Sequence, residues 1–130
     1  MVYWIDTNVV LRYLLRDNEK QFVIVRNLFL EHKNGTKKVE CLSQVLVEVV
    51  HVLLSFYKIS RKEIDALVGG FVESAPIEIE NRKGLRWIIK RYSETQLGFV
   101  DLLLIEKAKS GFGEVFSFDK KLINYQKKVK

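Results

Sequence analysis

The sequence predicts an α/β fold in which short strands alternate with helices. Four runs rich in apolar, β-branched or aromatic residues are separated by longer segments whose apolar residues recur at helical spacing. Strands that alternate with helices pair in parallel and carry helices on both faces. We therefore expect a three-layer α/β/α arrangement around a central parallel sheet of four or five strands. The four expected strands are residues 2–5, 38–42, 76–79 and 114–118, and the last residues would supply the fifth.

Length and composition indicate one globular domain over residues 1–130. Hydrophobic residues make up 48% of the chain and charged residues 29%, as in ordinary globular proteins. The longest apolar segment, 45–54, is interrupted by Glu48 and His51, which argues against a membrane span. The first residues lack a basic segment before an apolar one, so we expect a cytoplasmic protein. The single cysteine, Cys41, excludes an internal disulfide.

The positive charge is concentrated near the end of the chain. The formal net charge is +6, and residues 107–130 hold seven lysines against two acids. A basic surface favours polyanionic partners, nucleic acid first. A solubilising tail explains the charge equally well.

Local signals place the boundaries of the helices. Asn34-Gly35 ends a helix over 19–33, and Ser60 to Glu63 forms a capping box that opens a helix to 73. Other helices are expected over 43–57, 82–92 and 99–110, and short helices after Asp6 and Asp119. Ser43 and Asn81 are expected to be the N-caps of the helices that follow them.

Four acids interrupt apolar patterns at distant points of the chain. Asp6 and Asp119 each end an expected strand, at the edge where parallel sheets bind their ligands. Glu48 and Asp101 lie in helices that are otherwise strongly apolar, where an unpaired carboxylate is costly. We predict that the four carboxylates meet at one edge of the sheet.

A divalent cation would relieve the repulsion in such a cluster. Carboxylate oxygens without sulfur or a histidine cluster suit Mg²⁺ or Mn²⁺. One or two such ions can activate a water for in-line attack on a phosphodiester. The acids and the basic surface thus predict a metal-dependent nuclease.

Each acid also has a purely structural interpretation. Asp6 and Asp101 could cap the helices that begin near them, and Asp119 could belong to an ordinary turn. Glu48 could pair with a buried cation, for which Arg12 is the nearest candidate. Each interpretation is about as good as the catalytic one alone, but the recurrence of four such acids favours a shared site.

The residues around these acids resemble the four motifs of PIN domains, most closely those of VapC-type toxins. The matching stretches are Ile5-Asp6-Thr7-Asn8-Val9, the helix that holds Glu48, residues 99–105 and residues 116–122, in the family's order and spacing. The resemblance implies an endoribonuclease that cleaves RNA with Mg²⁺ or Mn²⁺. It also implies a cognate antitoxin as partner and assembly as a homodimer. By the same resemblance Asp6, Glu48, Asp101 and Asp119 are the metal-binding and catalytic acids, and Asn8 and Ser117 are supporting polar residues.

Further features of the sequence concern the role of Glu48, a partner contact and a basic stripe. Glu48 either binds the metal or orients a water. An unusually apolar helix over 19–33 suggests a contact with another subunit or partner. Arg82, Arg86 and Lys90 form a basic stripe that suits a solvated helix face better than a phosphate contact. The rival interpretations are a receiver-like signalling module, which leaves Glu48 unexplained, and an RNA-binding PIN-like scaffold without activity.

Overall fold

A computed structural model describes residues 1–129 of the chain. Its sheet has three parallel strands in the order β1-β2-β3: β1 (Val2–Trp4), β2 (Lys38–Cys41) and β3 (Glu78–Ile79). Tyr3 lies opposite Val39, and Cys41 opposite Ile79. The predicted α/β class and parallel sheet are confirmed, with one or two strands fewer than expected.

The helices follow the predicted order. They are α1 (Thr7–Leu15), α2 (Glu19–Lys33), α3 (Ser43–Ser55), α4 (Arg61–Ile64), the π-helical turn η1 (Asp65–Gly69), α5 (Gly70–Ser74), α6 (Arg82–Glu94), α7 (Phe99–Ser110) and α8 (Lys120–Lys128). Among the described residues, none of these helices is long and apolar enough to cross a membrane.

The helix starts show which predicted caps form. Ser60 accepts a hydrogen bond from the Glu63 amide, as the capping box requires. Ser43 is instead the first residue of α3, and its hydroxyl donates to the Glu80 carboxylate at 2.8 Å. Asn81 holds the N-cap position of α6 without a side-chain cap, at φ 55°, and its amide reaches Glu106 of α7.

One cluster of buried apolar residues runs from α1 and α2, across β2, through α3 and the α4–α5 segment to α6 and α7. Apolar residues of each face the others at helical spacing, because every third or fourth position of an amphipathic helix lies on one side. The fully buried members with the largest side chains include Leu46 and Leu53 of α3, Ile64 of α4, Ile88 of α6 and Leu102 of α7. Burial of this face fixes how α3 and α7 lie against each other.

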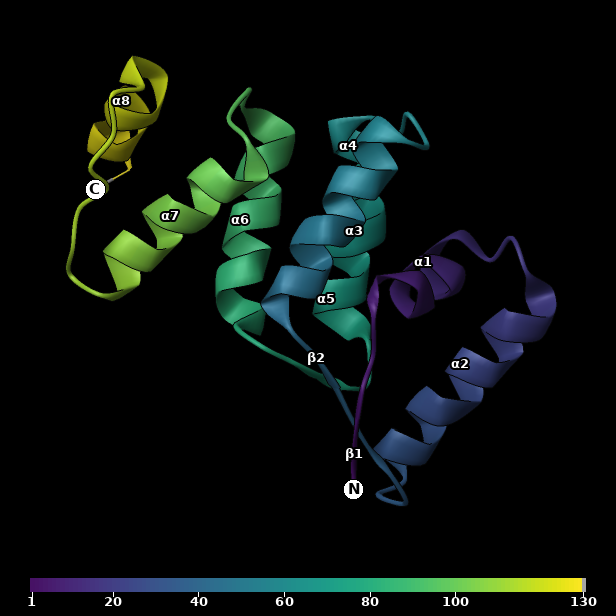
Figure 1. Cartoon of the computed structure of the whole chain (residues 1–130). Helices are drawn as coiled ribbons and strands as arrows, with labels where there is room; N and C mark the ends of the chain where they lie inside the picture. Colours follow the sequence, from purple (N-terminus) through teal and green to yellow (C-terminus); the bar gives the residue numbers. More distant parts are fainter. Residues whose placement is uncertain (130) are drawn as a thin grey trace.

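The predicted fourth strand, residues 114–118, is wrong for this structure. These residues follow α7 without strand pairing and lead into α8, at the opposite end of the molecule from α1 and α2 (Figure 1). The edge strand expected from the last residues is also not found up to Val129, where α8 and its C-cap lie. We call residues 1–110 the body and residues 111–129 the C-terminal arm.

Candidate functional site

A cavity between α3 and α7 brings two of the four predicted acids together. Glu48 of α3 and Asp101 of α7 both line it, and its volume is about 500 Å³. His51 and Arg61 line the same cavity. The arrangement follows from the core, because burial of Val49 and Leu53 on one side of α3 turns Glu48 and His51 to the other.

Glu48 is therefore exposed rather than enclosed by its apolar neighbours. Its helix looks apolar all round in sequence, yet part of its surface borders the open cavity. Arg12, the candidate partner for Glu48, contacts other groups. One of its nitrogens lies 3.4 Å from the Asp17 carboxylate, and another donates to the Tyr57 hydroxyl at 3.2 Å. The proposed Glu48–Arg12 pair is not the one the structure forms.

Asp101 lies in the first turn of α7 and is partly buried. Its carboxylate accepts a hydrogen bond from the Gly98 amide at 3.3 Å. This bond satisfies one of the free N–H groups at the start of the helix and holds the carboxylate beside the cavity. Asp101 thus acts as a capping group, as its structural interpretation predicts. The same hydrogen bond also orients its carboxylate.

Asp6 and Asp119 are themselves the N-cap residues of α1 and α8. Asp6 accepts from the Val9 amide at 3.0 Å, and Asp119 accepts from the Lys121 amide at 2.9 Å. Both side chains are exposed, as is that of Asn8. The Ser117 hydroxyl accepts a hydrogen bond from the backbone amide of Asp119 at 2.9 Å, and its supporting role stays a prediction.

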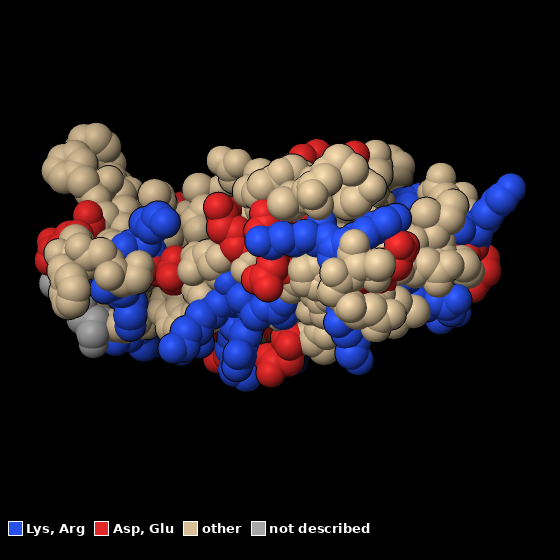
Figure 2. Space-filling model, turned by 90° about the horizontal axis from the view of Figure 1, so that it is seen from below, with Lys and Arg blue, Asp and Glu red and all other residues tan. Residues whose placement is uncertain are grey.

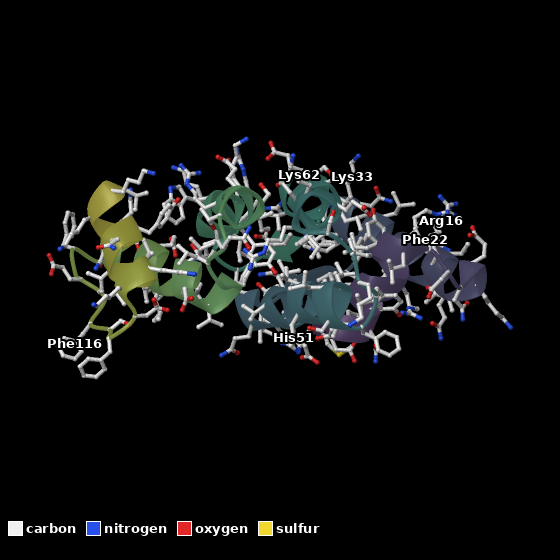
Figure 3. All side chains as sticks on the ribbon, turned by 90° about the horizontal axis from the view of Figure 1, so that it is seen from above. Arg16, Phe22, Lys33, His51, Lys62 and Phe116 are labelled. Carbon is white, nitrogen blue, oxygen red and sulfur yellow. The ribbon has the colours of Figure 1, made fainter. Side chains whose placement is uncertain are left out.

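The structure does not bring all four acids into one place. Asp6 opens α1 and Asp119 opens α8, and these helices lie at opposite ends of the molecule (Figure 1). Figure 3 likewise places Phe116, in the arm, far from His51 on α3. Within residues 1–129, no group of three or more His, Cys, Asp or Glu side chains is placed to hold a metal ion. In this arrangement the acids do not fit a divalent cation.

Arg61 is a candidate functional residue that the sequence did not reveal. Its guanidinium donates to the carbonyls of Thr95 and Leu97 and stacks 4.0 Å from the centre of the Tyr92 ring. Burial raises the pKa of the Tyr92 hydroxyl, and the Arg61 charge opposes that rise. Arg61 thus places a fixed positive charge at the cavity that holds Glu48 and Asp101. In the sequence it is only the second residue of a capping box.

The basic stripe on α6 has structural partners. Arg82 donates to the carbonyls of Val72 in α5 and of Ala75 just after it. Arg86 pairs with Glu73 at 3.0 Å. Lysine and arginine side chains on the face seen in Figure 2 are interspersed with acids rather than gathered in one uniform patch. The expectation that the stripe is a structural, solvated face is in keeping with these contacts.

A second group of carboxylates lies where the three strands end. Glu40, Glu78 and Glu80 line a small hollow there together with Trp4 and Cys41. Bonds from the Ser43 hydroxyl and amide lower the pKa of Glu80. Burial raises the pKa of the Cys41 thiol to about 11, which leaves it a neutral, packed side chain.

Comparison with known proteins shows the family of the chain. The PIN domain model matches residues 3–128. A VapC ribonuclease from Aquifex aeolicus (strain VF5) is 32% identical over 118 residues, covering 90% of this chain and 87% of that protein. No solved structure matches the chain significantly. With a family model that spans nearly its whole length and a close relative of similar size, the chain belongs to the PIN domain family.

Proposed function

We propose that the protein is a metal-dependent endoribonuclease. The observation that carries the proposal is the full set of four acids, in the family's order, within a chain similar to a VapC ribonuclease. The cavity shared by Glu48 and Asp101 supports it, because it places two of these acids beside the positive charge of Arg61. RNA carries its negative charge along its backbone, so such a cation favours its approach.

Mg²⁺ or Mn²⁺ is the proposed cofactor, with Asp6, Glu48, Asp101 and Asp119 as its ligands. The choice rests on the donor set, since four carboxylates without thiolates favour hard divalent cations. Asn8 and Ser117 are proposed as supporting residues near the acids. These assignments require Asp6 and Asp119 to come together, which a single chain in this arrangement does not achieve.

Substitution of aspartate by asparagine tests the acids without removing the helix caps. Asparagine retains the oxygen that accepts the amide bonds at Asp6 and Asp101 but carries no charge. We expect Asp6→Asn, Asp101→Asn and Glu48→Gln each to reduce RNA cleavage on the order of 100-fold or more. Chelation by EDTA should have the same effect, and added Mg²⁺ or Mn²⁺ should restore the wild type.

Glu94→Gln is the matched control, because Glu94 is an exposed acid of α6 whose nearest cation, Lys90, lies 3.9 Å away. It should cleave RNA like the wild type. Cleavage that survives both chelation and Asp101→Asn would contradict the proposal. Binding of RNA without any cleavage by the wild type would instead indicate the silent scaffold considered above.

We also propose that the enzyme is the toxin of a toxin–antitoxin pair. The proposal rests on similarity to the VapC ribonuclease and on exposed apolar side chains of α2, where Ile24 and Leu30 face solvent. Such a surface suits a protein partner. A small DNA-binding protein encoded beside this gene should bind the chain and inhibit RNA cleavage. Failure of any neighbouring gene product to inhibit would remove this part of the proposal.

A further inference from the structure

β1 is an edge strand with an uncovered side. It pairs with β2 through Val2, Tyr3 and Trp4, and in residues 1–129 it has no second neighbour. Its residues are poorly covered for a strand of a parallel sheet, since Trp4 is 61% exposed and Tyr3 36%. Parallel sheets are normally buried on both faces, and an open edge offers unpaired N–H and C=O groups to another strand.

The C-terminal arm has the pattern of a strand but no strand to pair with among the described residues. Its residues 114–118 alternate between exposed and half-buried side chains, the period-two pattern of a strand. Val115 and Ser117 are the half-buried ones. Phe116 and Phe118, which are 90% and 94% exposed, have ring centroids only 5.8 Å apart. Two neighbouring phenylalanines facing solvent indicate a strand whose partner surface is missing.

The arm is also an organised unit. The Val115 amide donates to the side-chain oxygen of Gln126 at 2.7 Å, and the Gln126 amide donates back to the Val115 carbonyl at 3.4 Å. Gln126 is buried, which makes these bonds costly to break. Val115 is therefore tied to α8, so residues 114–118 and α8 can move to a sheet together.

Return of the arm to its own β1 is opposed by the position of α7. In Figure 1, α7 lies on the far side of α6 from the strands, and α6 and α7 pack against each other. Leu102 and Ile105 anchor α7 in the core, so its end at Ser110 is fixed. The linker 111–113 spans only about 10 Å when fully extended. Phe112 in this linker has φ 57°, a strained conformation for an aromatic residue, as expected where a chain is turned outward.

We propose that two copies of this chain exchange their C-terminal arms, so that residues 114–118 of each copy extend the sheet of the other along β1. Addition in parallel, with Asp119 level with Asp6, places Phe116 beside Tyr3 and Phe118 beside Ile5. The carboxyl ends of parallel strands meet at one sheet edge, so the exchange brings Asp119 of one copy to Asp6 of the other. Each site then contains acids from two chains.

Charge complementarity supports the arm of a second copy as the partner of β1. Lys120 and Lys121 follow Asp119 directly, and docking of the arm would bring them near the exposed Asp6 carboxylate at the end of β1. Opposite charges at such a contact favour the correct alignment over others. A reciprocal exchange also leaves neither copy with an open β1 edge, as expected for a closed two-fold dimer.

Engineered cysteines test the contact without reference to activity. The chain with Cys41→Ala, Tyr3→Cys and Phe116→Cys should oxidise to a covalent dimer, seen on a non-reducing gel. A control with Phe56→Cys in place of Phe116→Cys should stay largely monomeric, because the exposed Phe56 follows α3 and lies outside the arm. An oxidised monomer would show that the arm closes on its own β1, and the absence of any disulfide that the two do not meet. Either result overturns the exchange.

Complementation tests the shared site, and this part rests on the proposed nuclease function. Chains with Asp6→Asn and with Asp119→Asn, each inactive alone, are co-expressed with different tags. An exchanged heterodimer has one intact site, so a random mixture should regain about a quarter of wild-type cleavage. Co-expression of Asp6→Asn with Glu48→Gln should regain none, because both residues lie in the body.

The outcomes separate the two proposals. A covalent dimer together with a wild type that cleaves no RNA would retain the exchange and reject the nuclease. A wild type that cleaves RNA, with no recovery in the mixture of Asp6→Asn and Asp119→Asn, would retain the nuclease and reject the exchange.

Discussion

The body and the C-terminal arm have similar sequence patterns but very different burial. Every helix of the body except the smallest turns contributes several side chains to the core, whereas the arm contributes Leu122 and Gln126 to the buried set. The arm nevertheless carries phenylalanines at 112, 116 and 118, all at least 90% exposed. An apolar pattern thus indicates which face of a segment tends to be buried. Whether that face is buried depends on the surface available to pack against it.

The largest expected effect that tests this comparison comes from the body. Leu102 of α7 is fully buried, and Leu102→Ala should lower the free energy of unfolding by about 2–5 kcal/mol, because it leaves a cavity among packed side chains. Leu104 of the same helix is 46% exposed, and Leu104→Ala should cost less than about 1 kcal/mol. Urea denaturation of both variants measures the difference, and equal losses would contradict the described core.

A smaller and local effect is expected in the arm. Gln126→Ala removes both hydrogen bonds to Val115, so the Val115 amide should exchange with solvent about fivefold faster, since one lost bond is worth about 1 kcal/mol. Amide hydrogen exchange detects this, while the urea transition of the body should hardly move. Asn124→Ala, an exposed change on α8, serves as control. A large shift of the global transition would mean that arm and body unfold together.

The smallest effect concerns the thiol of Cys41. Because burial raises its pKa to about 11 in the folded protein, its contribution to stability is full below about pH 9 and is lost as the pH rises towards 11. Cys41→Ala should lack this part of the pH dependence. The wild-type thiol should also resist alkylation at pH 8, where a cysteine replacing the exposed Phe118 reacts readily. Equal alkylation rates at the two positions would be inconsistent with a buried Cys41.

Much of the fold could be predicted because its signals are local. The bounds predicted for α2 and α7 match the structure, since caps and glycines mark their ends. The π-helical turn over Asp65–Gly69 gave no signal, because the whole stretch reads as one amphipathic helix. Residues 114–118 have the alternation of a strand, but pairing depends on which surface they meet, and that information is not local.

The same difference between local and non-local information applies to the candidate site. The identity of the four acids could be read from their unusual neighbours, and the structure places Glu48 and Asp101 on one cavity. Their caps could be anticipated too, because Asp6 and Asp119 precede helices. The position of Asp119 relative to Asp6 could not be predicted from the sequence, because it depends on the conformation of residues 111–113, which join the arm to the body. Arg61 was missed because its partners are backbone carbonyls, which no sequence pattern displays.

The distance between Asp119 and the rest of the acids makes the amount of protein itself a control on cleavage, if the exchange holds. A site assembled from two molecules empties on dilution, and its activity then falls faster than the quantity of enzyme. While monomers predominate, the number of such sites would rise as the square of the protein concentration.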